Sequence, residues 1–459
     1  MFILVIVCTI STVFELGYFL SRSKEVGGIK VIGDAEYRKK SKKVQFATSF
    51  SIVRNTIQLF EGYPENGTDR HLLHLQGIKS ITCLWAILGH SYIFGAYFFN
   101  LDNIFNYSND QRSFTYQGVK QAQFAADTMF LLSAFNTVYF AIRRLRMPGT
   151  KKVAFWAFFY IRRCVRLMPI IAFNLWFYYA LTPWSYIGAT FPQEHDDRCQ
   201  HNWWTTILFL NNFINPREKC LGWTWWFSVD FQLFLTTPIF ILSLMKWPIV
   251  GIGLAGGCVA VHVVTTVVYA LDHGSSSMMI IQALDLIRNG GPLALSYENI
   301  YIMPWTRMGP FGIGIILAYI LTRTRFRFKI NILLNIIGWT LSLLMGIIIM
   351  YGLYPYQDSW KLMPRELDIT YLALSRIAWA VGVAYVIFAC ANGNGGFINS
   401  ILSSKFFQVM GKLAFTNFVV HPIVQEYWIL ARERLFHFMV VDMVSNGGGI
   451  SPREGGIFF

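Results

Sequence analysis

The stretch GIKSITCLWAILGH, residues 77–90, carries two ionisable side chains within an otherwise apolar run. Eleven positions separate Lys79 from His90, which is almost three whole turns of an α-helix. The two side chains therefore share one helical face, roughly 16 Å apart along the axis. Because the hydrocarbon of a bilayer disfavours both groups, a membrane-crossing segment of this kind is expected to use them for binding, pairing or catalysis.

The composition of the whole chain predicts that this segment does cross a membrane. Of 459 residues, 54% are hydrophobic and only 14% are charged, whereas a soluble protein carries about 25% charged residues. A spanning helix needs about 20 predominantly apolar residues. We therefore predict an all-α fold, a polytopic membrane bundle of about ten helices that satisfy their own backbone hydrogen bonds in lipid. The predicted spans are 1–20, 78–99, 123–141, 167–184, 223–244, 249–270, 305–322, 332–352, 370–391 and 406–430.

The net charge of +14 is not spread evenly along the chain. Lys and Arg gather in short stretches between apolar segments, at 38–43, 143–152 and 323–329. Such clustering is typical of cytoplasmic loops, which collect positive charge, and it argues against nucleic acid as a partner. The pattern predicts membrane lipids as partners, a basic cytoplasmic linker at 21–70, and an N-terminus that faces the lumen or the outside.

The long loop at 185–222 falls on the lumenal or extracellular side in this topology. It contains Cys199 and Cys220, which the oxidising compartment allows to form a disulfide, with two free thiols as the alternative. Asn106 begins the sequon Asn-Tyr-Ser in another loop on that side. It is therefore a predicted glycosylation site, and the protein a predicted glycoprotein.

Ionisable residues inside the predicted spans are few. They are Lys79, His90, Asp127, Asp230, His262, Arg307, Arg376 and His421. By default such groups mark a functional site or an interhelical pair. The pairing alternative is Asp127 or Asp230 with Arg307. Several such groups in one bundle favour a buried polar site.

The stretch FYIRRCVRLMPII, residues 159–171, adds arginines at the predicted cytoplasmic surface. Arg162 and Arg166 are four positions apart and face the same way, with Arg163 beside them. Forked guanidinium groups suit a diphosphate such as that of coenzyme A. Ordinary positive charge at the cytoplasmic surface is the alternative explanation.

Six stretches occur in the order found in one family of membrane enzymes, and together they cover roughly residues 50–430. They are GIKSITCLWAILGH, DTMFLLSAF (127–135), RRCVRLMP (162–169), WTWWFSVDFQ (223–232), YIMPWTRMGPFGIGIILAYIL (301–321) and MGKLAFTNFVVH (410–421). In these stretches the chain resembles the acyltransferase type 3 family, and most of all its animal branch, the nose-resistant-to-fluoxetine proteins. On this resemblance residues 71–430 form the acyltransferase membrane domain.

The resemblance implies transfer of an acyl group from cytoplasmic acyl-CoA to a lipid or another hydroxyl acceptor, with no permanently bound cofactor and no metal. Family members pair an arginine with a histidine at the spacing of Lys79 and His90, so the lysine keeps the charge but loses the bidentate fork. His90 is then the expected general base or acyl-accepting group, because an imidazole titrates near neutral pH. Asp127 or Asp230 is expected to orient it. The expected substrate-binding residues are Lys79, Arg162, Arg163, Arg166, Arg307 and His421.

Further expectations concern the flanks, the location and the competing function. Members of the animal branch normally carry a lumenal N-terminal domain and one more C-terminal span, so residues 431–459 are expected to form a truncated lumenal tail. The expected location is the endoplasmic reticulum or the plasma membrane. The alternative function is lipid or xenobiotic transport on the same fold, since buried charges also bind cargo along a pathway. The absence of repeated halves favours the enzyme.

Overall fold

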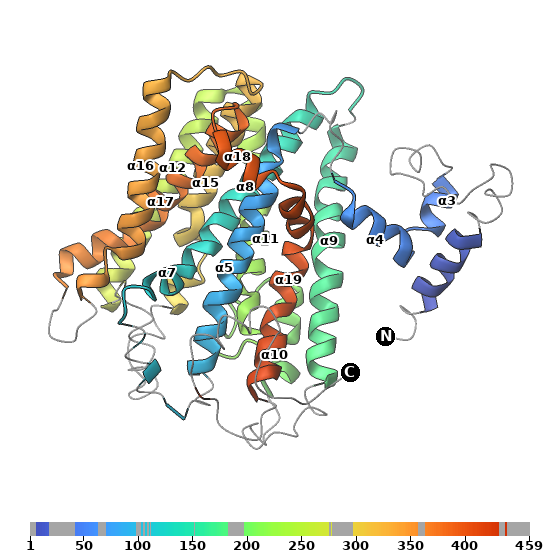
Figure 1. Cartoon of the computed structure of the whole chain (residues 1–459), viewed down its shortest axis with the longest axis horizontal. Helices are drawn as coiled ribbons and strands as arrows, with labels where there is room; N and C mark the ends of the chain where they lie inside the picture. Colours follow the sequence, from blue (N-terminus) through green and yellow to red (C-terminus); the bar gives the residue numbers. More distant parts are fainter. Residues whose placement is uncertain are drawn as a thin grey trace.

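Long helices packed side by side form the body of the molecule in the computed structural model (Figure 1). The structure describes residues 6–17, 42–62, 70–97, 102–103, 106–107, 110, 112–150, 152–181, 197–274, 277, 297–356, 363–430 and 437. Within these residues there is helix and no strand, which confirms the predicted all-α class. The long helices are α5 (His74–Tyr97), α8 (Phe124–Leu145), α9 (Lys152–Leu181), α11 (Trp225–Lys246), α12 (Pro248–His273), α15 (Met308–Thr324), α16 (Ile332–Tyr351), α17 (Arg365–Ala391) and α19 (Lys405–Leu430). The short α-helices are α3 (Lys42–Ala47), α4 (Ile52–Phe60), α7 (Gln117–Lys120), α10 (Asp197–Ile207) and α18 (Gly396–Leu402).

Six helical segments of the described chain are long and apolar enough to cross a membrane. They are Arg70–Phe94, Gln117–Leu145, Gly222–Lys246, Pro248–His273, Ile332–Tyr356 and Arg365–Ala391. Three more helices, α9, α15 and α19, lie in the same bundle but are shorter or more polar, and the predicted count of ten stays a prediction. Of the predicted span 1–20, the structure describes an apolar helix at Ile6–Gly17, which is only 12 residues long. Most of the predicted linker 21–70 and almost all of the tail 431–459 lie outside the described residues.

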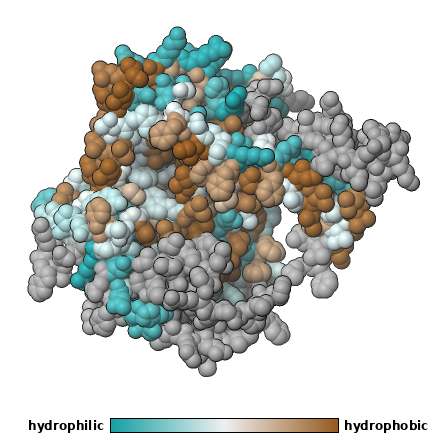
Figure 2. Space-filling view, viewed as in Figure 1, coloured by the Kyte–Doolittle hydropathy of each residue, from teal (hydrophilic) through white to brown (hydrophobic). Residues whose placement is uncertain are grey.

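The outer surface of the bundle is apolar, as a lipid-facing surface requires. On α16 only Ile349 is buried, while Leu333, Leu343 and Ile348 are all more than 60% exposed to the surroundings. Figure 2 shows hydrophobic residues over much of the visible lateral face and hydrophilic residues along its upper edge. An apolar surface of this extent is far larger than a soluble monomer exposes, so the bundle is a membrane protein.

One helix differs from the prediction in a way that matters for function. Residues 142–166 were expected to form a cytoplasmic loop before a span at 167–184, but α9 already begins at Lys152. The apolar residues before the arginines continue the helical pattern, and Pro169 lies inside the helix without ending it. The arginines at 162–166 are therefore positioned by a continuous helix, about 15 Å or more from its first residue.

Helices α5 and α19 pack closely because a glycine stands at their contact. A Cβ at Gly411 of α19 would lie 2.8 Å from the backbone carbonyl oxygen of Gln76 on α5. Gly314 of α15 approaches the backbone of Leu131 on α8 in the same way. Small residues at helix contacts allow such close approach in membrane proteins. The α5–α19 and α8–α15 pairs thus form the tight centre of the bundle.

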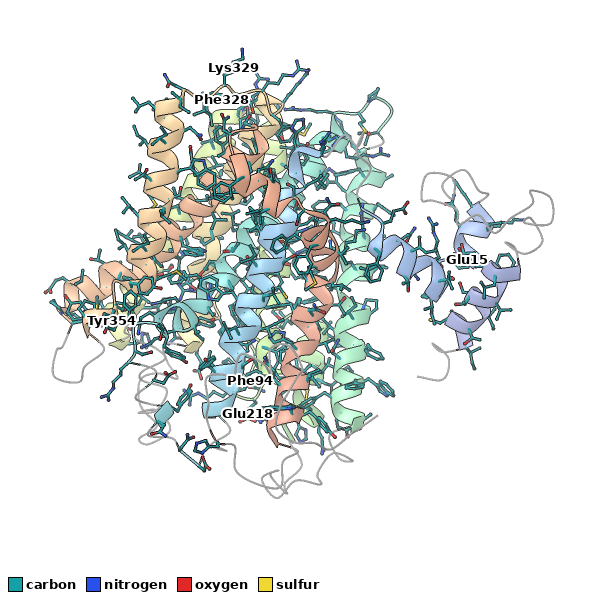
Figure 3. All side chains as sticks on the ribbon, viewed as in Figure 1. Glu15, Phe94, Glu218, Phe328, Lys329 and Tyr354 are labelled. Atoms are coloured by element: carbon teal, nitrogen blue, oxygen red, sulfur yellow. A yellow bond between two sulfur atoms is a disulfide. The ribbon has the colours of Figure 1, made fainter. Side chains whose placement is uncertain are left out.

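The two ends of the bundle differ in character. Phe328 and Lys329 lie at one end, and Phe94 and Glu218 lie at the other (Figure 3). The first end, which carries the basic loop at 323–329, is called the basic end below. The second, which carries the loop with Cys220, is called the disulfide end. The positive-inside pattern predicts that the basic end faces the cytoplasm.

Candidate active site

A pair of histidines from two helices forms the polar centre of the candidate site. Nδ1 of His90 on α5 lies 2.7 Å from Nε2 of His421 on α19. The rings stack with centroids 5.0 Å apart and planes inclined by 12°. His421 is buried, whereas His90 is only half-buried. The packing of α5 on α19 therefore brings together two side chains that are 331 positions apart in the sequence.

Hydrogen bonding determines which nitrogen of each ring carries the proton. Nδ1 of His421 lies 3.0 Å from the backbone carbonyl oxygen of Asn417, and because a carbonyl only accepts, this nitrogen donates. Nε2 of a neutral His421 is then an acceptor, and His90 donates to it through Nδ1. The remaining nitrogen, Nε2 of His90, is left with its lone pair. Among the described residues it has no hydrogen-bond partner.

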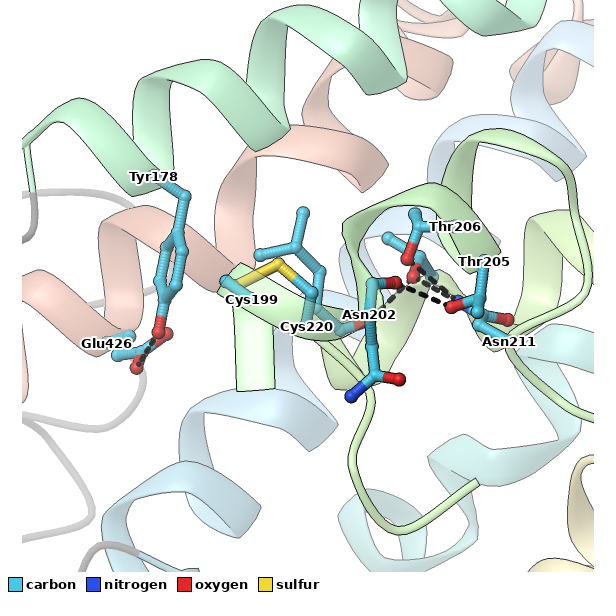
Figure 4. The surroundings of a disulfide bond; sticks show 10 residues. Tyr178, Cys199, Asn202, Thr205, Thr206, Asn211, Cys220 and Glu426 are labelled. Atoms are coloured by element: carbon cyan, nitrogen blue, oxygen red, sulfur yellow. Dashed lines mark hydrogen bonds between the residues drawn. A yellow bond between two sulfur atoms is a disulfide. The ribbon is translucent and has the colours of Figure 1, made fainter. Parts of the chain in front are cut away.

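Aromatic rings surround this pair toward the disulfide end. The ring of Phe94 stacks on His90 with centroids 5.3 Å apart, and Trp223 lies 6.2 Å from Phe94. Tyr178 packs edge-on against Trp223 and donates a 3.0 Å hydrogen bond to Glu426 (Figure 4). Among the described residues, aromatic rings thus line this side of His90, and the Glu426 carboxylate lies beyond them.

Asp127 does not orient His90, contrary to one of the two predicted arrangements. Its side chain is completely buried, and Oδ1 accepts a 2.8 Å hydrogen bond from Nη1 of Arg307. Nη1 of Arg376 lies 3.5 Å from Oδ2. Arg307 is held further by two hydrogen bonds to the carbonyl oxygen of Tyr301. The structure contains the predicted pairing of Asp127 with Arg307. The Arg307 guanidinium is already hydrogen-bonded within the bundle, so it is not a substrate-binding group as predicted.

Asp230 is likewise paired with an arginine and not with His90. Arg163 turns inward from α9 and donates to Asp230, and the same nitrogen lies 3.1 Å from the hydroxyl of Ser133 on α8. A carboxylate buried in a low-dielectric bundle gains far more from a guanidinium than from a neutral imidazole. The prediction that an aspartate orients His90 is therefore wrong in this structure. The side chain that contacts Nδ1 of His90 is His421.

An aromatic layer separates the histidine pair from Asp127. The indole of Trp226 donates to the carbonyl oxygen of Ala126 on one side and packs 5.5 Å from the ring of Phe418 on the other. Phe418 in turn lies 5.7 Å from His421. The histidine pair and the ionic group around Asp127 are thus separate from each other within the bundle.

Positive side chains gather farther toward the basic end. Arg162 and Arg166 are exposed on α9, and the Arg166 guanidinium lies 5.5 Å from the ring centroid of Phe415 on α19. Lys79 is half-buried on α5, and the charge of Arg166 is close enough to act on it. No carboxylate of the described residues lies within salt-bridge distance of these three groups. They are thus available for an anion, whereas Arg163 is not.

The disulfide end is tied down by the bond between Cys199 of α10 and Cys220, as predicted (Figure 4). Nearby, the buried amide of Asn211 donates a 2.6 Å hydrogen bond to Thr224 at the start of α11. Burial lowers the pKa of Lys219, beside the disulfide, to about 8, while the Glu298 carboxylate opposes that shift. This loop is held as a folded unit over the end of the bundle.

Two other predictions concern that end and bound metals. The side chain of Asn106 is exposed just beyond α5, and its glycosylation stays a prediction. Among the described residues no group of three or more His, Cys, Asp or Glu side chains is arranged to hold a metal ion.

Sequence reasoning missed two charged residues of α19, although both lie in the last predicted span. The ammonium group of Lys412 donates to the carbonyl oxygens of Gln58, Leu59 and Glu61, at 2.7, 3.2 and 2.6 Å. It thereby satisfies orphan carbonyls at the end of α4. Glu426 is the acceptor for Tyr178. The rule that intramembrane charges mark sites identifies both residues, but their partners are distant in sequence.

Comparison of the sequence with known proteins identifies relatives of this chain. A family model described as an acyltransferase domain matches residues 73–444. Nose resistant to fluoxetine protein 6 of Caenorhabditis elegans is 28% identical over 415 residues, which are 86% of this chain and 50% of that protein. Regulator of hypoxia-inducible factor 1 of the same animal is 26% identical over 220 residues, 45% of this chain and 41% of that protein. The chain spans about half the length of the curated relatives it matches. No solved structure matches it.

Proposed function

Because the chain belongs to the acyltransferase type 3 family, we propose that it is an integral membrane O-acyltransferase that moves an acyl group from acyl-CoA to a hydroxyl acceptor. The observation that carries the proposal is the unpartnered Nε2 of His90. A neutral imidazole with one nitrogen held as a donor and the other left as an acceptor is what a general base requires. His421 and the carbonyl of Asn417 hold that tautomer.

In the proposed reaction, Nε2 of His90 accepts the proton of the acceptor hydroxyl as its oxygen attacks the thioester carbonyl. The new bond is the ester C–O bond, and the bond that breaks is the C–S bond to coenzyme A. The thiolate leaves and takes up the proton that His90 holds, so that the products are the ester and free thiol. Transfer by a positioned base of this kind contributes about a hundredfold or more in rate.

The donor is proposed to enter from the basic end. Lys79, Arg162 and Arg166 lie toward that end without a carboxylate of the described residues in salt-bridge distance, and arginine forks suit the diphosphate of coenzyme A. Lys79 lies roughly 16 Å from His90 along α5, a separation that the extended pantetheine arm of coenzyme A covers. The thioester then reaches the histidine pair while the charged part of the donor stays at the proposed cytoplasmic surface.

The acceptor is proposed to be a lipid hydroxyl or another hydroxyl compound that enters from the disulfide end. The aromatic rings of Phe94, Trp223 and Tyr178 around His90 favour an acceptor with an apolar part. The Glu426 carboxylate, which accepts the hydrogen bond of Tyr178, lies at the margin of the same surroundings. The disulfide end faces the lumen of the endoplasmic reticulum or the outside of the cell in this proposal.

The test is acyl transfer by the purified chain in lipid, with radiolabelled acyl-CoA and a membrane lipid extract as the acceptor pool. The variant His90→Gln keeps a hydrogen-bonding side chain and removes the titratable ring. We expect it to insert and to bind acyl-CoA normally, and to lose about 99% of its transfer activity, the hundredfold contribution of a general base. His273→Gln, at the end of α12 and outside the site, is the matched control with unchanged transfer.

Two outcomes contradict the proposal. If His90→Gln retains more than about a tenth of the wild-type rate, its activity is well above what a hundredfold loss leaves. His90 is then not the general base. If the wild type binds no acyl-CoA in a preparation that does bind lipid, acyl-CoA is not the donor. Transport is then the favoured function.

A further inference from the structure

Helix α4 has its polar and apolar faces reversed relative to a helix on a water-exposed surface. The side chain of Arg54 is only 2% exposed, and Ser51 at the start of the helix is buried. Ile52 and Phe60, by contrast, are 60% and 58% exposed. They are eight positions apart, so they share one face with Thr56 between them. A helix that buries a guanidinium and exposes a phenyl ring is expected to contact lipid rather than water.

The residues just before α4 continue this apolar surface and add positive charge to it. Phe46 in α3 is 79% exposed, and Phe50 in the turn before α4 is 49% exposed. Lys42 and Lys43, at the start of α3, are exposed as well. These two lysines end the first basic stretch of the chain, at 38–43. Apolar side chains beside lysines are typical of segments that bind an anionic membrane surface.

The far end of α4 is fixed to the bundle close to the basic end. The ammonium group of Lys412 on α19 holds three carbonyl oxygens at the end of α4. Gly411, the residue before it, packs against Gln76 of α5. Just before α5, the ring of His71 stacks on Phe326 of the basic loop with centroids 5.2 Å apart. Gln76 is therefore roughly 8 Å of helix away from that loop, and α4 meets the bundle where headgroups adjoin acyl chains.

The helix at 6–17 is joined to the same part of the molecule. The Ser11 hydroxyl donates a 2.7 Å hydrogen bond to the carbonyl oxygen of Ala47 in α3. The backbone N–H of Ile52 in α4 donates a 3.0 Å hydrogen bond to the hydroxyl of Thr12. These three helices form the N-terminal arm. In the view of Figure 1 the arm projects from the bundle beside α9, and Figure 2 shows hydrophobic residues on its described part.

We propose that the N-terminal arm lies in the headgroup region of the leaflet at the basic end and binds anionic phospholipids there. Lys42 and Lys43 contact the lipid phosphates, and the exposed rings of Phe46, Phe50 and Phe60 enter the upper part of the acyl chains. A second copy of the chain places the same basic surface opposite these lysines and repels them, whereas anionic lipid attracts them. Each lysine near an anionic membrane surface strengthens binding by about fivefold.

Spin labels on the full chain in phosphatidylcholine vesicles test where the arm lies. The half-buried free thiols Cys8 and Cys164 are first replaced by alanine, and one cysteine is then introduced at Phe60. Labels at Leu343 on the lipid-facing surface of α16 and at Lys329 in the basic loop are the lipid and water references. We expect the Phe60→Cys label to be more accessible to dissolved oxygen than to a water-soluble nickel complex, as the Leu343→Cys label is.

Hydrogen exchange of the α4 backbone amides tests the two lysines. Exchange is followed in vesicles of phosphatidylcholine alone and in vesicles of mixed phosphatidylcholine and phosphatidylserine. For the wild type we expect slower exchange in the anionic vesicles, by about fivefold for each lysine that contacts lipid. The double variant Lys42→Gln/Lys43→Gln is expected to exchange at nearly the same rate in both. Arg327→Gln removes an exposed charge at the same end of the bundle and is the matched control, which keeps the wild-type difference.

The proposal is overturned if the Phe60→Cys label is as accessible to the nickel complex as the Lys329→Cys label, because α4 then faces water. It is overturned as well if both reagents are excluded from that label, which indicates a second protein copy on this face. Equal exchange of wild-type α4 in the two kinds of vesicle, or loss of the difference in Arg327→Gln, shows that the two lysines are not the contact with anionic lipid. Neither measurement uses an acyl donor, so the outcome is independent of the proposed enzyme activity.

Discussion

Replacing His421 tests the proposed orientation of the base. The substitution His421→Phe keeps an aromatic ring beside Phe418 and His90 but removes the acceptor nitrogen. The substitution His421→Gln instead places an amide oxygen at a similar reach, so it retains an acceptor for the Nδ1–H of His90. The two variants differ in the single property that the proposed role requires.

The size of the effect follows from the 2.7 Å contact between the rings. In His421→Phe the buried donor of His90 is left without its acceptor, which costs about 1–3 kcal/mol. About 1.4 kcal/mol corresponds to tenfold in rate. If the whole cost destabilises the conformation in which His90 is oriented for proton transfer, kcat is expected to fall roughly 5- to 150-fold. In His421→Gln the acceptor is kept, and a loss of no more than about fivefold, the equivalent of about 1 kcal/mol, is expected.

The assay is steady-state transfer from labelled acyl-CoA by protein reconstituted in lipid, with kcat and KM determined separately. KM for acyl-CoA is expected to stay near its wild-type value in both variants, because the proposed donor contacts lie roughly 16 Å away. The order of kcat is therefore wild type, His421→Gln, then His421→Phe. This split distinguishes an orienting residue from a general loss of folding, which lowers the active fraction of both variants alike.

Two results refute the reasoning. If His421→Phe keeps more than half of the wild-type kcat, His90 needs no partner. If His421→Gln is as inactive as His421→Phe, the acceptor atom is not what His421 supplies, and a direct role in chemistry or substrate contact replaces the orienting role.

Three further predictions concern Arg166, the ion pair between Arg163 and Asp230, and the disulfide. Arg166→Gln is expected to weaken acyl-CoA binding several-fold with unchanged unfolding temperature, since an exposed arginine contributes little to stability; calorimetric binding equal to wild type speaks against the donor site. Arg163→Gln leaves Asp230 buried and unpaired, so we expect the folded state to be destabilised by about 3 kcal/mol. Adding Asp230→Asn is expected to restore part of that stability. Equal unfolding temperatures for the wild type and Arg163→Gln contradict this prediction. Cys199 and Cys220 are expected to resist a membrane-impermeant thiol reagent on intact cells until a reductant is added; labelling without reductant disproves the bonded state.

The sequence predicts the class of this fold well because lipid imposes strict rules. Apolar segments of about 20 residues must become helices, and the described residues of the segments predicted at 78–99 and 123–141 are helical, in α5 and α8. The shared face of Lys79 and His90 also follows from helical periodicity alone. Helix boundaries outside the hydrocarbon are less constrained, which is why the extension of α9 back to Lys152 was not predicted.

The partner of His90 was not predictable by the same means. Asp127 and Asp230 were the two candidates, nothing local in the sequence ranks them, and His421 was expected to bind substrate instead. The choice is made by competition, because Arg307 and Arg163 offer Asp127 and Asp230 a charged partner that a neutral imidazole cannot match. A sequence gives the number of buried charges but not which helices bring them within 3 Å.

The consequence for mechanism is that the proposed base works without a carboxylate. In a Ser-His-Asp triad the positive charge that forms on the imidazole is stabilised by an aspartate. Here the hydrogen bond from His90 to His421 lets two rings share that charge, with the carbonyl of Asn417 at the far end of the chain. Before the reaction both rings are neutral, so the pair carries no lasting charge in the bundle. The positive charge exists only until the departing thiolate takes the proton, and a permanent counter-ion beside His90 is therefore not needed.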